Sequence, residues 1–293
     1  MRLLAVVTHG LLRGLGFQRL RRRLGDWSLV FYRKGRGGEP WVLLHGLGSN
    51  AISWTPVARH LAPDSRVLIP ELSRLGGSRG PRAGLAVDEG ARVIAELLRR
   101  ELAGEPATVV GLSLGGWLAV RLALLEPSLV ARLILIDAAG YRDQDWDAIR
   151  SLITVEDEAG VDRLYGALFQ RVPWIFRRSR ATFRKVFASP VVRGVISELR
   201  EADLFGPDEL ARLEMPVGVI WAEHDGLFSA AVGRQIARHA NGAPFYLVPG
   251  VGHALHWEDP QRLVEAMEDC RRELPSRAAA PVASMTPAGD APA

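Results

Sequence analysis

The sequence predicts an α/β fold with a mostly parallel central sheet, and three observations support this. Short apolar runs alternate along the chain with longer segments of helical periodicity, as in sheets covered by helices. Several of these runs are apolar without interruption, which is typical of strands buried on both faces. Residues 140–213 contain no convincing strand, so we expect them to lie outside the sheet as a helical lid over its edge.

The individual elements follow from local composition and periodicity. Seven strands are predicted from short runs rich in apolar, β-branched and aromatic residues. They are Ser28–Arg33, Trp41–Leu44, Arg66–Ile69, Ala107–Val110, Leu133–Ile136, Val217–Trp221 and Pro244–Val248. Five helices outside the lid are predicted from their apolar spacing. They are Ile52–Leu61, Val87–Leu102, Gly115–Leu125, Ala230–His239 and Pro260–Leu274.

These elements divide the chain into four parts. The core comprises residues 28–139 and 214–274, with the lid, 140–213, inserted between two of its strands. A basic segment, 1–27, precedes the core, and a tail, 275–293, follows it. The tail lacks large apolar residues apart from a single Val and Met, so we expect it to be disordered.

The N-terminal segment combines apolar residues with arginines at loosely helical spacing. Residues 1–36 carry nine basic residues against the single acid Asp26, although the whole chain has a formal net charge of only +4. No run approaches the ~20 apolar residues of a spanning helix, and Arg13 interrupts the run that a signal peptide needs. Two interpretations stay open: Met1–Arg23 contacts an anionic membrane as an amphipathic helix, or a basic helix packs on the domain. We expect a cytoplasmic protein, with any such contact peripheral and at the inner face of a membrane.

Composition argues against several other kinds of site. Hydrophobic residues make up 48% and charged residues 24%, which is enough apolar material for a core without metal or disulfide. Cys270 is the only cysteine, so no intramolecular disulfide can form and a closed structural zinc site is not expected. The arginines lack the motif of a nucleic-acid reader, so we expect no nucleic-acid partner. The oligomeric state is left open.

The sharpest signal for chemistry is the run Gly111-Leu112-Ser113-Leu114-Gly115, between a predicted strand and a predicted helix. A serine at such a turn occupies strained backbone and exposes its hydroxyl at the carboxyl end of the sheet. Gly111 and Gly115 are needed there because a Cβ at either position would clash within the turn. The backbone N–H of Leu114 would point at a developing oxyanion.

A second glycine-rich turn, His45-Gly46-Leu47-Gly48, follows the predicted strand Trp41–Leu44. In an acyl-transfer site, the second oxyanion donor comes from a separate loop, and the backbone N–H of Leu47 is placed to supply it. His45 precedes the serine in the chain. We therefore assign His45 and Gly46 to supporting this loop, His45 through hydrogen bonds.

A serine hydroxyl needs a general base, and that base needs a third group to hold its tautomer. His253 follows a predicted strand, and Asp225 follows another. Their order, Ser113 then Asp225 then His253, is the one expected of a hydrolase built on this sheet. Asp137, after Leu133–Ile136, is an alternative position for the acid. A triad with two backbone donors suffices for ester hydrolysis, so no cofactor or metal is expected.

From about residue 28 to residue 273, the chain resembles the α/β-hydrolase family. The resemblance rests on HGLGSNAISW at 45–54, GLSLGG at 111–116, AEHDGLFS at 222–229 and GVGHALHWEDP at 250–260. It implies the α/β-hydrolase fold, with Ser113 as nucleophile, Asp225 as acid and His253 as base. It also implies Leu47 and Leu114 as backbone oxyanion donors.

One loop departs from the family pattern. Members commonly carry Asp-Leu-Pro-Gly-x-Gly-x-Ser after the strand that follows the first helix. This chain has Glu71-Leu-Ser-Arg-Leu-Gly76-Gly77-Ser78, with Ser73-Arg74 in place of Pro-Gly. We expect the change to bear on substrate entrance more than on the triad.

The lid is apolar and aromatic, and we assign Phe169, Trp174 and Phe176 to contacts with substrate. Basic residues follow this segment, and it is similar to the lid of lipase-like members related to monoacylglycerol lipases. We therefore predict a serine esterase or lipase that cleaves carboxylic esters of small hydrophobic substrates through an acyl-enzyme. Two alternatives stay open: a carbon–carbon bond hydrolase of ring-fission products, and a ligand-binding protein of this fold with little turnover.

Overall fold

The computed structural model describes residues 9–61, 65–72, 74–81, 86–198, 200 and 203–276. Eight strands form one sheet in the order β1-β2-β4-β3-β5-β6-β7-β8. They are β1 (Gln18–Leu24), β2 (Trp27–Lys34), β3 (Gly37–Leu44), β4 (Ser65–Glu71), β5 (Ala107–Leu112), β6 (Val130–Ile136), β7 (Val217–Ala222) and β8 (Phe245–Val248). The β1–β2 and β2–β4 pairs are antiparallel, and the remaining pairs are parallel.

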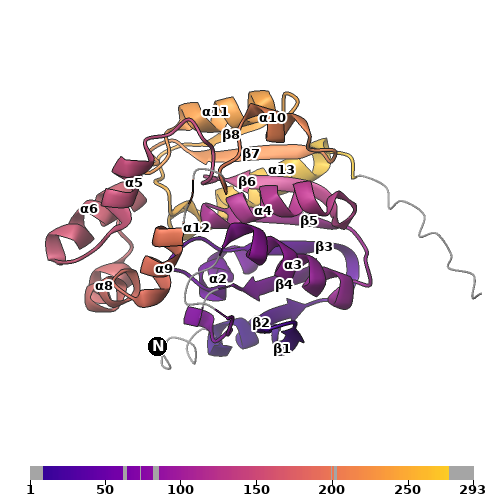
Figure 1. Cartoon of the computed structure of the whole chain (residues 1–293), viewed down its shortest axis with the longest axis horizontal. Helices are drawn as coiled ribbons and strands as arrows, with labels where there is room; N and C mark the ends of the chain where they lie inside the picture. The colour runs from indigo at the N-terminus through magenta and orange to yellow at the C-terminus, as the bar shows by residue number, and fades with distance from the viewer. Residues whose placement is uncertain are drawn as a thin grey trace, which may run out of the picture.

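Helices cover both faces of this sheet (Figure 1). One face packs against α3 (Val87–Glu101), α4 (Leu114–Leu125) and α11 (Ala230–His239). The other face packs against a 3₁₀ turn (Ala51–Trp54), α2 (Thr55–Ala58) and α13 (Pro260–Glu273), while α12 (Leu255–Glu258) precedes α13. Strand β6 shows why both layers form: Leu133 and Leu135 point into one core, and Ile134 and Ile136 into the other. The predicted α/β-hydrolase fold is confirmed.

Each of the seven predicted strands falls in one of β2–β8. Four of the five predicted core helices are likewise found as single helices, with boundaries that agree within one residue. The exception is Ile52–Leu61, where the chain forms the 3₁₀ turn and the short α2 instead of one continuous helix. Pro56 near the start of α2 lacks a backbone N–H and fits only a first helical turn, which explains the break.

The N-terminal segment differs from its prediction. Residues 18–24 form the edge strand β1 and not part of a helix, so the sheet begins ten residues before the predicted core boundary at Ser28. If residues 18–24 were helical, the backbone N–H and C=O groups along the outer edge of β2 would stay unpaired. Pairing with β1 satisfies them, and this outweighs a weak helical periodicity. Residues 9–14 are helical, and Leu12 is fully buried in the core. Residues 1–8 lie outside the described part.

The insertion between β6 and β7, residues 140–213, is helical in its described parts. Its helices are α5 (Trp146–Ile153), α6 (Glu158–Leu168), α7 (Trp174–Arg178), α8 (Arg180–Phe187), α9 (Pro190–Glu198) and α10 (Pro207–Ala211). Figure 1 shows α5, α6, α8 and α9 together at one side of the sheet, whereas α10 returns to lie beside α11. A bridge between Tyr141 and Phe205 joins the two ends of the insertion.

Two further predictions concern segments at the limits of the described chain. Of the tail predicted to be disordered, residues 277–293 lie outside the described residues. Within the described residues, no helix has the length and apolar character needed to cross a membrane.

The central position of β6 leads to a stability prediction. Leu133 is completely buried, so Leu133→Ala should lower the free energy of unfolding by about 2–5 kcal/mol. Leu247 in β8 is 38% exposed and offers a matched control, for which Leu247→Ala should change stability by about 0.5 kcal/mol or less. Urea unfolding followed by circular dichroism measures both. Equal losses in the two variants would contradict the assignment of β6 to the centre of the core.

Candidate active site

Ser113 lies in the turn between β5 and α4, in the strained conformation expected from the sequence. Its backbone has φ 55° and ψ −121°, a combination that a non-glycine residue seldom adopts. Surrounding hydrogen bonds hold it there: its N–H donates to Ile136 O at 2.9 Å, and its carbonyl accepts from Ala139 N at 3.1 Å. Such strain costs about 1–3 kcal/mol and persists only where neighbouring structure enforces it.

Two glycines allow this turn to pack. A Cβ on Gly111 would lie 2.3 Å from the carbonyl oxygen of Gly115, and a Cβ on Gly115 would lie 2.2 Å from that of Leu44. Any larger residue would push α4 away from β3. The turn and the end of β3 are therefore held in direct contact.

The loop after β3 lies beside Ser113. A Cβ built on Gly46 would stand 3.3 Å from Ser113 Cβ, so the two backbones approach closely. Leu47 and Leu114 both line the cavity into which Ser113 opens. Leu114 is the first residue of α4, where the N–H has no acceptor within the helix. The two backbone donors expected from the sequence thus belong to segments that meet at the serine.

His45 is buried beneath this loop. Its Nδ1 lies 3.0 Å from the carbonyl oxygen of Gly46. Burial lowers the pKa of His45 to about 4 even though the Gly46 contact favours the charged form. The imidazole is therefore neutral at neutral pH, and the Gly46 contact requires its proton on Nδ1. This places His45 as a structural contact of the loop, away from the general-base position.

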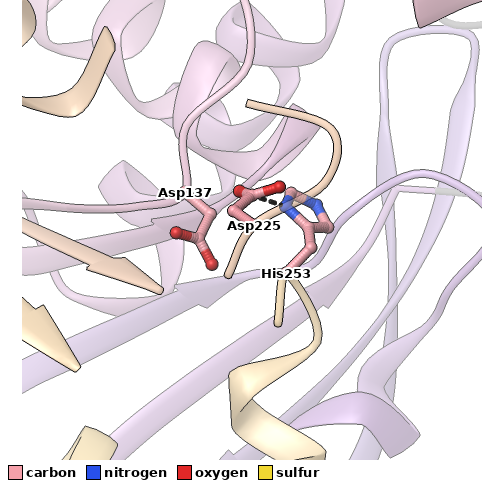
Figure 2. A group of neighbouring side chains, drawn as sticks. All are labelled: Asp137, Asp225 and His253. Atoms are coloured by element: carbon pink, nitrogen blue, oxygen red, sulfur yellow. Dashed lines mark hydrogen bonds and ion pairs between the residues drawn. The ribbon is translucent and has the colours of Figure 1, made fainter. Parts of the chain in front are cut away.

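His253 and Asp225 form the second half of the site (Figure 2). His253 Nδ1 and Asp225 Oδ2 are 2.8 Å apart, and both side chains are buried. The other oxygen of Asp225 accepts the backbone N–H groups of Leu227 at 2.7 Å and Phe228 at 2.9 Å. The carboxylate is thus held by its own loop while one oxygen orients the imidazole.

Asp137 lies next to this pair but does not replace Asp225. Its Oδ1 accepts the Ala222 N–H at 2.8 Å, and its Oδ2 is buried without a hydrogen-bond partner in the described structure. Burial raises the pKa of Asp137 well above its usual range, the negative charge of Asp225 raises it further, and the Ala222 hydrogen bond opposes them. Figure 2 shows the hydrogen bond to His253 coming from Asp225. The geometry therefore favours Asp225 over Asp137 as the partner of His253.

These three side chains also form the one group of potential metal ligands found among the described residues. One ligand atom from each of Asp137, Asp225 and His253 lies within 4.8 Å of the others. A metal would have to separate His253 Nδ1 from Asp225 Oδ2, which already contact each other. The arrangement fits proton transfer better than metal binding.

The insertion supports the loops that carry Asp225 and His253. The N–H of Gly226 donates to Ala167 O at 3.1 Å, and the N–H of Ala254 donates to Leu168 O at 2.8 Å. Both acceptors lie at the end of α6. The insertion thus holds the loops of Asp225 and His253 in place through two backbone hydrogen bonds.

A cavity of about 260 Å³ lies above Ser113 and His253, enclosed largely by the insertion. Its walls are mainly aliphatic and aromatic, with a few polar side chains such as Asn50, Ser179 and Thr182, and among the described residues no Lys, Arg, Asp or Glu lines it. The apolar lining includes Leu47, Ile52, Leu114, Trp117, Trp146, Ile149, Ile153, Leu164, Leu168, Phe169, Ile175, Phe176, Phe183, Val186, Phe187, Val195, Leu227, Phe228 and Trp257.

Of the lid residues expected to contact substrate, Phe169 and Phe176 line this cavity. Trp174 does not: it is 70% exposed and borders a separate polar hollow. Sequence reasoning did not single out Phe183 and Phe187, which lie one helical turn apart on α8 and both line the cavity. Their i, i+4 spacing was the available signal, since such pairs share one helix face.

The loop that departs from the family pattern begins at a buried carboxyl. Glu71 is completely buried, 4.0 Å from His45 Nε2, and its carboxyl packs against Gly76 so closely that a Cβ there would overlap it. Burial raises the pKa of Glu71 to about 8, although the backbone N–H of Ala51 and the charge of Arg19 act in the opposite direction. At neutral pH, a protonated Glu71 therefore faces a neutral His45.

Comparisons with known proteins agree with this geometry. Residues 41–266 match the alpha/beta hydrolase family, and the chain belongs to that family. It is 39% identical over 262 residues to an uncharacterized protein of Mycobacterium tuberculosis, covering 81% of this chain and 76% of the relative.

Other similar proteins have named activities. A pimeloyl-[acyl-carrier protein] methyl ester esterase of Pectobacterium carotovorum is 28% identical, covering 81% of this chain and 96% of that one. A 2-hydroxy-6-oxononadienedioate/2-hydroxy-6-oxononatrienedioate hydrolase of Paraburkholderia xenovorans is 25% identical, covering 86% and 93%. The crystal structure of a putative lipase from Acinetobacter baumannii superposes with a TM-score of 0.80 at 17% identity, covering 92% and 96%, and so shares the fold.

The buried Glu71 predicts a pH-dependent stability. Because its pKa is raised in the folded protein, the folded state binds more protons than the unfolded state between about pH 4.5 and pH 8. Stability should therefore fall as pH rises through this window. Glu71→Gln keeps the shape of the protonated acid and removes the titration.

Urea unfolding from pH 5 to pH 8 measures the effect. The free energy of unfolding of Glu71→Gln minus that of the unmodified protein should increase by roughly 1 kcal/mol for each unit of increasing pH. Other titrating groups are common to both proteins and cancel in the difference. A difference that stays constant over this range would show that Glu71 does not keep its proton in the fold.

Proposed function

We propose that the protein is a serine hydrolase that cleaves carboxylic esters of hydrophobic acids through a Ser113–His253–Asp225 triad. The observation that carries the proposal is convergence: Ser113 at the strained turn and His253, which is hydrogen-bonded to Asp225, line one apolar cavity. Membership of the alpha/beta hydrolase family supports a hydrolytic reaction. The ester bond and the roles of the residues are our inference.

The proposed reaction follows from the proton positions. His253 donates its Nδ1–H to Asp225, which leaves Nε2 free to accept the Ser113 hydroxyl proton as Oγ attacks the ester carbonyl. The oxyanion accepts the N–H groups of Leu47 and Leu114. His253 then gives the proton to the leaving alcohol, and an acyl-enzyme remains. Water, deprotonated by His253, releases the acid and restores Ser113.

In this scheme Asp137 contributes by staying uncharged. Its raised pKa keeps a proton on the second carboxyl, so the ionised carboxylate beside His253 is that of Asp225 alone. A second negative charge would hold the imidazolium too strongly and weaken its return of the proton. We therefore assign Asp137 a positioning role.

The lining of the cavity favours esters over ring-fission products. The carbon–carbon hydrolase relative is named for a dicarboxylate, whose charges need cationic partners when they leave water. No cationic side chain lines the cavity among the described residues, and burial lowers the pKa of His256 to about 3, so this second histidine is neutral. An uncharged acyl chain fits such walls.

We further propose that the helical insertion acts as the substrate lid. Its aromatic side chains pack over the cavity: the ring centroids of Phe169 and Phe176 are 4.9 Å apart, and Phe176 also packs against Trp257 of α12, with centroids 5.3 Å apart. Tyr165 donates its hydroxyl to Phe176 O at 2.8 Å, which holds this cover together.

Hydrolysis of p-nitrophenyl esters of increasing acyl length tests the main proposal. Ser113→Ala should lower kcat by several orders of magnitude, to a residual rate, because no other group replaces the nucleophile. The rate should rise from acetate to medium-length chains as apolar contacts with the cavity increase. A fluorophosphonate probe should label the unmodified protein and not the variant.

If labelling and turnover are equally low in both proteins, the esterase proposal fails. A panel of ring-fission products then separates a carbon–carbon hydrolase from a ligand-binding protein.

The choice of acid has its own test. Asp225→Asn should lower kcat by about 10⁴-fold, because an asparagine stabilises the wrong imidazole tautomer. Asp137→Asn is the matched control: it resembles the protonated acid, keeps an acceptor for the Ala222 N–H, and should stay within about ten-fold of the unmodified protein. A larger loss with Asp137→Asn than with Asp225→Asn would reverse the assignment.

A further inference from the structure

The short helix α7 exposes apolar side chains to an unusual degree. Trp174 is 70% exposed and its neighbour Ile175 is 43% exposed. Single exposed apolar residues are ordinary on protein surfaces. Within the described residues, however, Trp174 is the most exposed large hydrophobic side chain, and Trp174 and Ile175 are the only two that are adjacent in sequence. This pair therefore needs a physical explanation.

Arginines without ion partners surround the pair. Arg171, Arg177 and Arg178 are exposed, and none of them forms an ion pair within the described part of the chain. Arg177 Nε donates to Val172 O at 2.9 Å, and the guanidinium of Arg178 lies 6.0 Å from the ring of Trp174. On the neighbouring α8, by contrast, Arg180 and Arg184 pair with acids of α6. Arginines without an ion pair occur elsewhere on the surface too, but at α7 they stand beside the exposed Trp174 and Ile175.

The acids nearest to α7 are already engaged. Glu258 accepts the backbone N–H of Arg171 through one oxygen and that of Gly252 through the other, each at 2.6 Å. Asp259 caps α13 and pairs with Arg262. These contacts hold the segment before α7 against α12. Glu258 and Asp259 line one hollow with Arg171, Arg177 and Arg262, so with Arg178 the arginines outnumber the acids and leave an excess of positive charge.

The same helix borders the mouth of the active-site cavity. Ile175 lines that cavity although it is 43% exposed, and Ser179 and Thr182 line it one and two turns further along the chain. A residue that contacts both solvent and the cavity marks an opening. A surface that receives α7 would therefore lie beside the entrance to the site.

We propose that Arg171, Trp174, Ile175, Arg177 and Arg178, here called the α7 tip, dock the protein on the surface of an anionic lipid bilayer. The indole of Trp174 and the side chain of Ile175 enter the interface, and the arginines bind lipid phosphates. This docking goes beyond the proposed esterase function. Only its consequence rests on that function: acyl chains of lipid esters would pass from the bilayer into the cavity without crossing water.

The chemistry of the α7 tip favours a bilayer over a protein partner. Two large apolar side chains are far fewer than the core of a stable protein interface, which buries about 800 Å² on each side. They suffice as an interfacial anchor when several cations assist, because each Lys or Arg near an anionic surface adds about a five-fold gain in affinity. A tryptophan beside arginines is the composition found at the headgroup level of membranes.

Part of the basic N-terminal segment is engaged within the fold. Arg22 pairs with Glu101, and Arg21 donates to Ser28 Oγ and to the carbonyl oxygen of Gly77. The edge strand β1 lies well apart from the insertion helices α6 and α8 in Figure 1. Arg13, Arg21 and Arg23 are exposed and form no ion pair within the described residues, so the β1 variant below tests their contribution separately.

Sedimentation with vesicles tests the proposal on the full chain. The unmodified protein should bind vesicles of phosphatidylcholine and phosphatidylglycerol in a 7:3 ratio, and bind phosphatidylcholine alone much more weakly. Trp174→Ser should lower the affinity for the mixed vesicles roughly ten-fold or more. The double variant Arg177→Gln/Arg178→Gln should lower it about 25-fold and reduce the salt dependence.

Two matched controls change other surfaces. Leu247→Ser replaces an exposed apolar side chain of β8, and Arg21→Gln/Arg23→Gln removes two charges of β1; both should bind like the unmodified protein. Hydrolysis of water-soluble p-nitrophenyl acetate should be unchanged in Trp174→Ser, because this residue does not line the cavity. If neither the unmodified protein nor the variants hydrolyse the ester, the esterase proposal fails. Vesicle binding can still be measured in that case, so the docking proposal is tested independently.

Several outcomes would overturn the docking proposal. The proposal fails if the unmodified protein does not sediment with the mixed vesicles. It also fails if Trp174→Ser binds them as well as the unmodified protein does. Loss of binding in the β1 double variant alone would assign the contact to the N-terminal segment. Binding to an acidic carrier protein without any binding to vesicles would show that the arginines recognise a protein.

Discussion

The close contact between the Ser113 turn and the end of β3 is the constraint on which the rest of the site depends. Gly115 packs against Leu44 O so tightly that no Cβ fits between them, and this brings the loop of Gly46 and Leu47 beside the serine. The Ser113 N–H donates to Ile136 O, and the Ser113 carbonyl accepts from the Ala139 N–H; both bonds hold the strained turn from the side of β6. The neighbouring parallel strands β3, β5 and β6 therefore have to be in register before the turn can expose the Ser113 hydroxyl.

The buried acids near this turn show how the fold tolerates titratable groups. Glu71 and Asp137 are both completely buried, and burial raises the pKa of each carboxyl. A neutral acid avoids most of the desolvation penalty that a charged one would incur. Asp225 differs because two backbone N–H groups and His253 contact its oxygens. The three buried carboxyl groups thus differ in how many hydrogen-bond partners the fold gives them.

The insertion contacts both the candidate site and the protein surface. Its α6 end holds the loops of Asp225 and His253, its inward aromatic residues enclose the cavity, and α7 carries the exposed Trp174. One segment of about 70 residues therefore supports the acid and base, forms the apolar wall and, in our proposal, contacts lipid. Its buried side chains belong to the same core cluster as one face of the sheet, so the insertion packs as part of the domain.

The sequence alone determined the strands β2–β8, four of the five predicted core helices, the serine turn, and the positions of Asp225 and His253 after strands. These features are local: apolar periodicity, glycines at a tight turn and the carboxyl ends of parallel strands are all visible in short stretches. Only the tertiary structure decided between Asp225 and Asp137, because both follow strands and the choice depends on which oxygen reaches His253.

Tertiary pairing also determined that Gln18–Leu24 forms a strand. Its pairing with β2 outweighed a weak helical pattern in the sequence. The same holds for Trp174 and Phe187: both are aromatic residues of the insertion, yet one is exposed and the other lines the cavity. Composition cannot distinguish them, because burial depends on how the short helices pack and not on any single residue.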